Sequence, residues 1–136
     1  MCGVALKLVK EAARYQGAFA SLSIGAPLLT SDQDSRIVAD ALAASTAAYD
    51  DGATAICLMG HGTEAAANEV YERMQKELAG SGRANYFIGT VEAAPTVDKV
   101  LSLVKAGNYK RVLLQPMMID AGDHANNDMA GEEEGS

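Results

Sequence analysis

Short apolar runs alternate with helix-like segments in the second half of the chain. Residues 54–59 are almost wholly apolar, which is typical of a strand covered on both faces of a parallel sheet. Residues 86–91 predict a second strand, and residues 111–119, rich in Val, Leu and Met, a third. Residues 64–78 and 95–107 instead repeat apolar positions every three or four residues, as an amphipathic helix does. The positions expected to face the core are Ala67, Val70, Tyr71, Met74 and Leu78 in the first helix and Val97, Val100, Leu101 and Val104 in the second. This order predicts an α/β fold with a parallel sheet built on a βαβαβ unit.

The residues before these runs are less regular. Residues 4–15 predict a helix with one apolar face, and residues 19–24 alternate apolar and polar positions as a short strand does. Residues 25–30 form a connection, and residues 31–49 predict another helix. Its expected N-caps are Ser31, Asp32 and Asp34, and its expected inward positions are Ile37, Val38, Ala41 and Leu42.

Composition indicates an ordinary globular domain. The 136 residues, 49% of them hydrophobic, suffice for one domain with a core. The formal net charge of −7 argues against a nucleic-acid partner. No apolar run approaches the roughly 20 residues that cross a bilayer, and the first residues lack the apolar core of a signal peptide. Cys57 lies inside an apolar run and forms no CxxC pair with Cys2, which predicts a buried thiol and fits a cytoplasmic location.

Candidate metal ligands follow each of the three apolar runs. His61 and Glu92 come just past the first and second runs, and His124 a few residues past the third. The carboxyl ends of parallel strands lie at one edge of a sheet, where ligands bind in such folds, so these side chains are expected to meet there. Two imidazoles and one carboxylate with open coordination positions suit a catalytic divalent metal such as Zn, Co, Ni or Fe.

Simpler interpretations exist for each residue alone. A histidine at a strand end is commonly a hydrogen-bonded loop residue, and Glu92 could complement a helix dipole before Pro95, which the first helical turn would tolerate. His124 could be one polar residue of a turn, in a loop that lacks the EF-hand order of a calcium site. The spacing by itself leaves the metal site and these alternatives open.

The surroundings of the first histidine are also informative. Gly60 and Gly62 would let the backbone approach a ligand closely. A helix starting near Glu64 would add its positive end beside Thr63, which would attract the carboxylates of a ligand.

Three segments together resemble a known family. Residues 59–63, 89–92 and 116–131 resemble the CbiK-type cobalt chelatases of anaerobic cobalamin biosynthesis, in the same order and spacing. Residues 25–30 look like the inter-domain segment of that family. The resemblance covers most of the chain, from about residue 19 to residue 131.

The resemblance implies a class II chelatase that inserts Co(II) into sirohydrochlorin with release of two pyrrole protons. Its metal ligands fall on His61, Glu92 and His124, and the two histidines are the implied proton acceptors. It also implies a three-layer chelatase-like (flavodoxin-like) fold, Co(II) as the substrate metal and no organic cofactor. The substrate contacts expected within these motifs are Gly60, Gly62, Thr63 and Met118.

The chain departs from the family in extent. The family has a whole amino-terminal α/β half before the inter-domain segment, and it continues with a helix, a strand and a helix beyond the acidic residues 132–134. Residues 1–30 are therefore expected to be the remnant of the first half with the connection, and residues 31–136 the second half, incomplete at its end. A fragment or a shortened gene product is expected, and the uncovered apolar surface of an open sheet predicts a homo-oligomer.

Other functions remain open at this point. Nickel or iron insertion into the same macrocycle uses the same ligand types. The chain could also bind metal or tetrapyrrole without turnover, or be a structural domain with idle histidines. The cations lie on helices or at strand starts, so the substrate's carboxylates would meet backbone N–H groups or cations of the missing half. Examples of these cations are Arg73, Lys76, Lys99, Lys105 and Lys110.

Overall fold

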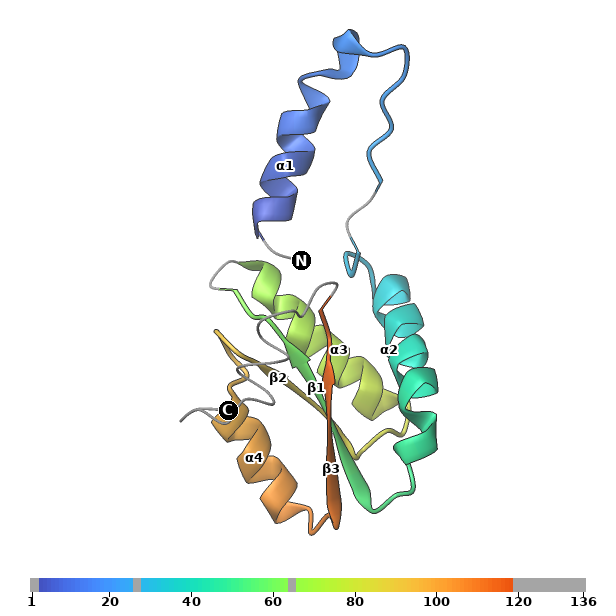
Figure 1. Cartoon of the computed structure of the whole chain (residues 1–136), viewed down its shortest axis with the longest axis vertical. Coiled ribbons are helices and arrows are strands. Elements are labelled where there is room, and N and C mark those ends of the chain that lie inside the picture. The colour runs from blue at the N-terminus through green and yellow to red at the C-terminus, as the bar shows by residue number, and fades with distance from the viewer. Residues whose placement is uncertain (1–2, 26–27, 64–65, 119–136) are drawn as a thin grey trace.

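The computed structural model of the chain describes residues 3–25, 28–63 and 66–118, with side chains from residue 7 onward. Figure 1 shows helices arranged around a small sheet, with the first helix set apart. In chain order the elements are α1 (Gly3–Ala13), α2 (Asp32–Thr46), β1 (Thr54–Gly60), α3 (Glu69–Gly80), β2 (Tyr86–Thr90), α4 (Val97–Ala106) and β3 (Arg111–Pro116), with 3₁₀ turns at Gln16–Ala18, Ala47–Tyr49 and Ala66–Asn68.

The sheet is parallel, as the sequence predicts. β1 lies in the centre, with β2 on one side and β3 on the other. Every residue of β1 is buried, which explains why its sequence is apolar without alternation. The pairs Gly60↔Thr90 and Met59↔Pro116 bring the carboxyl ends of all three strands to one edge.

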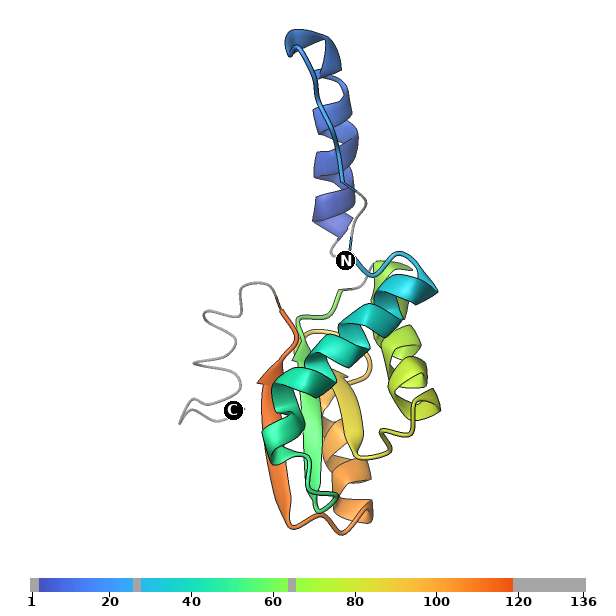
Figure 2. The same cartoon turned by 90° about the vertical axis from the view of Figure 1, so that its right-hand side faces the viewer.

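Helices cover both faces of this sheet, so the α/β prediction is confirmed and the layers number three. On one face of the sheet, α2 and α3 pack against Ile56 and Leu58 of β1. On the other face, α4 packs against Ala55 and Cys57 of β1 through Val100 and Val104. The two views in Figures 1 and 2 show this separation of α2 and α3 from α4. Among the described residues, no helix is long and apolar enough to span a membrane.

The strand predicted at residues 19–24 is wrong. These residues form no helix or strand, and Phe19 and Ile24 are 60% and 40% exposed. They follow α1 in a segment that stands away from the sheet (Figure 2). An alternating segment becomes a strand only where a partner strand takes its hydrogen bonds, and this one has none beside it.

The buried face of α2 is rotated from its predicted position. Ile37 is 58% exposed and Ala41 is also exposed, whereas the small polar residues Ser35 and Thr46 are buried. Their hydroxyls donate to backbone carbonyls one turn earlier in the same helix, at 3.1 and 2.9 Å. Because their hydroxyls are hydrogen-bonded, Ser35 and Thr46 can face the core at positions where a hydrophobicity pattern predicts solvent exposure. The start of α2 is as predicted, because the Ser31 side chain accepts from the N–H of residue 34 in a capping box.

The two later helices start after their predicted positions. The α-helix α3 begins at Glu69 rather than near residue 64. α4 begins at Val97, capped by the Thr96 side chain, so Pro95 precedes the helix and does not lie in its first turn. Val97 and the predicted core residue Leu101 are more than two-fifths exposed, while Val100 and Val104 are buried as predicted.

β3 is shorter and more exposed than its sequence indicates. It ends at Pro116 instead of residue 119, and Val112 and Leu114 are about half exposed. The register pairs these two residues with Ala55 and Cys57, which places them on the face that α4 covers. α4 reaches β1 and β2 but leaves this part of β3 open.

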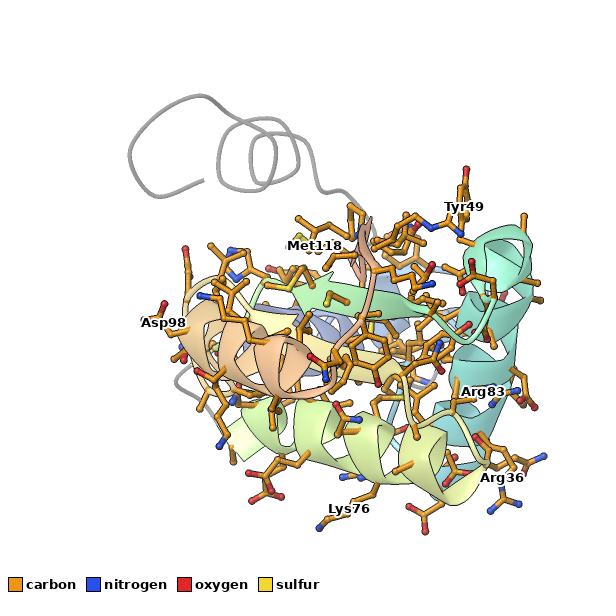
Figure 3. All side chains as sticks on the ribbon, turned by 90° about the horizontal axis from the view of Figure 1, so that it is seen from below. Arg36, Tyr49, Lys76, Arg83, Asp98 and Met118 are labelled. Carbon is orange, nitrogen blue, oxygen red and sulfur yellow. The ribbon has the colours of Figure 1, made fainter. Side chains whose placement is uncertain are left out.

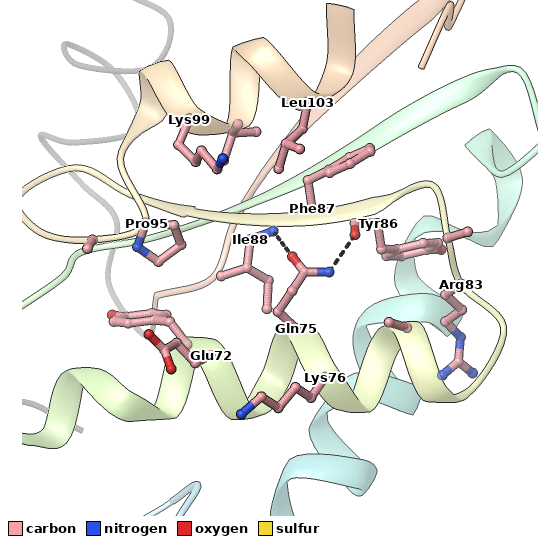
Figure 4. Close-up of a pocket in the computed structure, with 15 residues that line it drawn as sticks. Glu72, Gln75, Lys76, Arg83, Tyr86, Phe87, Ile88, Pro95, Lys99 and Leu103 are labelled. Atoms are coloured by element: carbon pink, nitrogen blue, oxygen red, sulfur yellow. Dashed lines mark hydrogen bonds between the residues drawn. The ribbon is translucent and has the colours of Figure 1, made fainter. Parts of the chain in front are cut away.

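A side chain closes the outer edge of β2. The amide nitrogen of Gln75, on α3, donates to the Tyr86 carbonyl at 3.0 Å, and its oxygen accepts from the Ile88 N–H at 2.8 Å (Figure 4). These bonds lie at the floor of a groove of about 490 Å³ between α3 and α4. Gln75 thus gives the edge strand the hydrogen bonds that a neighbouring strand would otherwise supply.

Candidate metal centre

His61 and Glu92 lie side by side just beyond the carboxyl ends of β1 and β2. The Nδ1 atom of His61 is 3.5 Å from Oε2 of Glu92, and both side chains are about half exposed. The Glu92 N–H donates to the His61 carbonyl at 2.9 Å, and the Val91 N–H donates to the Gly60 carbonyl at 3.0 Å. These backbone bonds extend the pairing of the two strands into the turns, which brings the two side chains to the same point of the sheet edge.

The hydrogen bonds of His61 indicate its tautomer. Nδ1 lies 2.9 Å from the Gly62 carbonyl oxygen, which can only accept, and it also faces the Glu92 carboxylate. A proton on Nδ1 suits both neighbours and leaves the ligand lone pair on Nε2. A histidine oriented in this way by a carbonyl or a carboxylate is the usual arrangement of a metal ligand.

The glycines beside His61 make room for neighbouring protein atoms. Gly60 is buried beneath the ring of Tyr71, with which a side chain at this position would collide. Gly62 has a φ of 88°, and a Cβ there would lie 2.8 Å from the Ala93 nitrogen. The two turns can therefore touch only because residue 62 lacks a side chain.

The backbone N–H groups of the His61 turn are already engaged. The Gly62 N–H donates to the Tyr71 hydroxyl at 3.1 Å, and the Thr63 N–H donates to Oδ1 of Asn68 at 3.1 Å. α3 itself begins six residues beyond Thr63. This leaves the backbone of residues 62 and 63 poorly suited to bind the carboxylates of a ligand, contrary to one of the two alternatives that the sequence left open.

The turn that carries Glu92 is organised by Thr90, which is fully buried. Its hydroxyl donates to the Ala93 carbonyl at 2.6 Å and accepts from the Ala93 N–H at 3.1 Å, while its own N–H donates to the Pro95 carbonyl at 2.8 Å. Thr90 is a site residue that the sequence patterns do not predict, although a polar residue that closes an apolar strand is a usable signal.

Asn68 and Tyr71 were likewise missed as site residues. The helix predicted over residues 64–78 places Asn68 inside it and Tyr71 on its core face. In the structure both side chains bond to the His61 turn. The available signal for Asn68 was its type, because asparagine is a weak helix former that favours caps and turns.

The third predicted ligand, His124, lies outside the described residues. Met118, a predicted substrate contact, is described and half-buried just beyond β3 (Figure 3). The strand end reaches the same edge as the other two, because the Met117 N–H donates to the Met59 carbonyl at 2.7 Å. Within residues 3–25, 28–63 and 66–118, no group of three side chains could hold a metal ion.

Cys57 is not a candidate ligand. It is buried in the centre of β1, as predicted, and burial raises the pKa of its thiol to about 11. Metals bind the thiolate form, which is scarce near neutral pH at such a pKa.

Two of the described cations lie away from the His61 and Glu92 turns, while Lys99 lines the groove that also borders Ala94 and Pro95 (Figure 4). Arg36 and Lys76 project from the outer sides of α2 and α3 (Figure 3). Arg36 is paired with Glu77 of α3 at 2.8 Å. The edge therefore offers an imidazole and a carboxylate, a donor set that suits a borderline divalent ion such as Co(II).

The sequence model of the family described as Cobalt chelatase (CbiK) matches residues 6–136. The chain belongs to this family. It is 36% identical over 121 residues to "Sirohydrochlorin cobaltochelatase CbiKC" of Nitratidesulfovibrio vulgaris (strain Hildenborough), covering 89% of this chain and 43% of that protein. It is 31% identical over 127 residues to "Sirohydrochlorin cobaltochelatase" of Salmonella typhimurium (strain LT2), covering 93% of this chain and 47% of that protein. The chain thus spans about half the length of these curated relatives.

Proposed function

We propose that the chain acts in the insertion of Co(II) into sirohydrochlorin and provides the part of the enzyme that holds the ion. Residues 31–136 would be the metal-holding half, and residues 1–30 the connection to the other half. The observation that carries the proposal is the 3.5 Å approach of His61 and Glu92 at the sheet edge, in a chain of the CbiK family. The names of the two relatives supply the metal and the macrocycle.

Co(II) is a substrate of this reaction, so its ligands must both bind and release it. His61, Glu92 and His124 are the proposed ligands. Glu92 faces Nδ1 of His61 in the structure, so its half-exposed side chain would rotate to reach an ion bound at Nε2. The half-exposed side chains of His61 and Glu92 support this role, because an ion held at an open edge can be passed on, whereas a closed cage would retain it. The Glu92 carboxylate offsets part of the positive charge of the ion.

Insertion also requires that two pyrrole N–H protons leave as two cobalt–nitrogen bonds form. An imidazole nitrogen can accept a proton only after it has released the ion, because both use the same lone pair. The proposed order at each histidine is therefore transfer of the ion, followed by acceptance of a proton. Of the substrate contacts expected from the sequence, Thr63 and Met118 are half-buried and remain proposed contacts. Gly60 and Gly62 are buried, so their proposed part is to shape the turn that carries His61.

The first experiment compares Co(II) binding and insertion in variants of the two described ligands. Titration of the chain with Co(II), followed by the visible absorption of the ion, should give binding that His61→Ala weakens by at least about tenfold. Addition of sirohydrochlorin should then change the absorption of the macrocycle in the wild type and not in His61→Ala.

Glu92→Gln keeps the size of the side chain and removes its charge, and we expect it to weaken Co(II) binding as well. Glu69→Gln is the matched control, since Glu69 is an exposed acid at the start of α3. His61→Ala with an unchanged insertion rate would show that the assignment is wrong. Competition by Ni(II) and Fe(II) in the same titration identifies the preferred metal.

A second candidate function is binding of the metal or tetrapyrrole without turnover. It is favoured by the described residues, where His61 and Glu92 meet but no group of three side chains could hold an ion. Tight Co(II) binding without any change in macrocycle absorption would support this alternative over insertion.

A further inference from the structure

Asn68 bonds to both turns of the candidate metal centre. Its side-chain oxygen accepts from the Thr63 N–H at 3.1 Å, in the turn that carries His61. Its side-chain nitrogen donates to the Ala94 carbonyl at 2.6 Å, in the turn that carries Glu92. One amide group therefore spans two turns that are about thirty residues apart in the sequence.

The backbone of Asn68 leaves its side chain uninvolved in helix capping. Asn68 is the last residue of the 3₁₀ turn Ala66–Asn68, which runs directly into α3, and its angles are helical (φ −65°, ψ −22°) and not the extended angles of a capping residue. Here the side chain makes no cap hydrogen bond, and its polar atoms are directed to the two turns instead. Helix capping therefore does not account for this side chain.

The two turns are also in direct contact on either side of the Asn68 bridge. The Glu92 N–H donates to the His61 carbonyl at 2.9 Å, and Gly62 lies against Ala93. These contacts fix where the turns meet but not how far they open around that point. The Asn68 bridge adds a second attachment, between Thr63 and Ala94, which limits this opening.

We propose that Asn68 is a positioning residue that holds the His61 turn and the Glu92 turn at the separation that a divalent ion requires. The proposal rests on the function proposed above for His61 and Glu92. Asn68 acts through the backbone of Thr63 and Ala94, so its role is to keep the two ligands together before the ion arrives. Supporting groups of this kind typically change metal affinity by about 10- to 100-fold.

The test uses the whole chain and two variants of Asn68. Asn68→Ala removes both bonds. Asn68→Asp keeps an acceptor for the Thr63 N–H but loses the donor to the Ala94 carbonyl. Because one of the two hydrogen bonds remains, this variant should still fold. The first measurement is amide hydrogen exchange by NMR without metal, and the second is the Kd for Co(II).

Asn85→Ala is the matched control. Asn85 is another half-buried asparagine, and its side-chain nitrogen donates to the Thr54 carbonyl at 3.0 Å and to Asp50 at 2.8 Å, at the opposite end of β1. The Asn85→Ala substitution therefore removes a similar number of side-chain hydrogen bonds, at a place far from the candidate centre. Any general loss of stability should therefore appear in this variant too.

We expect the Glu92 amide, which Asn68 does not contact, to exchange at least about tenfold faster in both Asn68 variants than in Asn85→Ala. The Thr63 amide should lose protection in Asn68→Ala and keep it in Asn68→Asp. The Kd for Co(II) should rise about tenfold or more in both Asn68 variants and stay unchanged in Asn85→Ala.

The outcomes separate the two proposals. Equal Glu92 exchange in the Asn68 and Asn85 variants, or an unchanged Co(II) Kd in Asn68→Ala, would overturn the positioning role. A wild-type chain that does not bind Co(II) at all would instead overturn the proposed function, while the exchange rates would still report whether Asn68 holds the two turns together.

Discussion

Gly62 lies where the turns of His61 and Glu92 meet. Its φ of 88° is a conformation that side chains with a Cβ rarely adopt, and the missing Cβ leaves room for Ala93. Both requirements come from the meeting of two distant segments. From the sequence, the absence of a side chain at Gly62 is expected to let a ligand approach the backbone. In the structure, it is the turn of Glu92 that occupies this space.

Gly62→Ala should destabilise the fold by about 1–3 kcal/mol, because the backbone is strained and the new Cβ meets the Ala93 nitrogen. Urea denaturation followed by circular dichroism measures this loss. Gly82→Ala is the control, since Gly82 has a φ of 82° but no atom within 4 Å of its absent Cβ. This variant should lose only the free energy that the positive φ costs a residue with a side chain. Equal losses in both variants would show that the contact with Ala93 contributes nothing.

The proposed ligands can be predicted from the sequence more readily than the residues that support them. His61 and Glu92 were predicted because each directly follows an apolar run, and parallel strands bring such positions together. Asn68 and Thr90 were missed because their roles depend on contacts between loops, which leave no periodic pattern. His124 was predicted by the same reasoning as His61, and its role stays a prediction.

At the scale of elements, the start of β1 is tied to the start of β3 through Asp51. Its carboxylate accepts from the Thr54 hydroxyl at 2.8 Å and from the Ala53 N–H at 3.0 Å, and it pairs with Arg111. The bond from Thr54, then that from Ala53, and further the Arg111 guanidinium lower the pKa of Asp51 from 3.8 to about 2. Because the folded state lowers this pKa, the carboxylate stabilises the fold above about pH 4, and this contribution is lost as the pH falls towards 2.

Asp51→Asn should remove this pH dependence while keeping the shape of the turn. The stability of the wild type relative to the variant should be largest above pH 4 and decline as the pH falls through about 2, measured by urea midpoints across that range. Thr54→Val removes the hydrogen bond that lowers the pKa of Asp51 most. The loss of stability in acid should therefore begin at a higher pH in this variant. Parallel profiles for the wild type and Asp51→Asn would contradict this account.

The elements themselves were largely predictable because their periodic patterns are long. The three strands and the helices between them were expected within a few residues of where they lie. The errors have specific causes. The predicted strand at residues 19–24 lacks a partner, and the face of α2 was misjudged because Ser35 and Thr46 satisfy their hydroxyls within the helix.

At the scale of the molecule, one face of the sheet carries exposed apolar side chains. Val112 and Leu114 of β3 are about half exposed. On α4, Leu103 faces the groove beside β2, so Val97 and Leu101 project from the opposite flank, towards β3. These four residues are exposed apolar side chains on the same face of the sheet, and exposed apolar side chains promote association.

We expect the chain to self-associate through this surface of Val97, Leu101, Val112 and Leu114. Leu114→Lys should shift the sedimentation coefficient towards that of a monomer in analytical ultracentrifugation. Leu8→Lys is the control, because Leu8 is 64% exposed on α1, which lies apart from the sheet (Figure 1). A wild type that sediments as a monomer at all concentrations would contradict the expectation.

The amide of Gln75 has a consequence for how the sheet can grow. It occupies the outward peptide groups of Tyr86 and Ile88, and the Tyr86 N–H is taken by the Arg83 carbonyl. An additional strand at β2 would first have to displace these partners, at the cost of the bonds they make. Extension of the described sheet is therefore directional: the flank beside β3 is the side on which a further strand can join without breaking this cap.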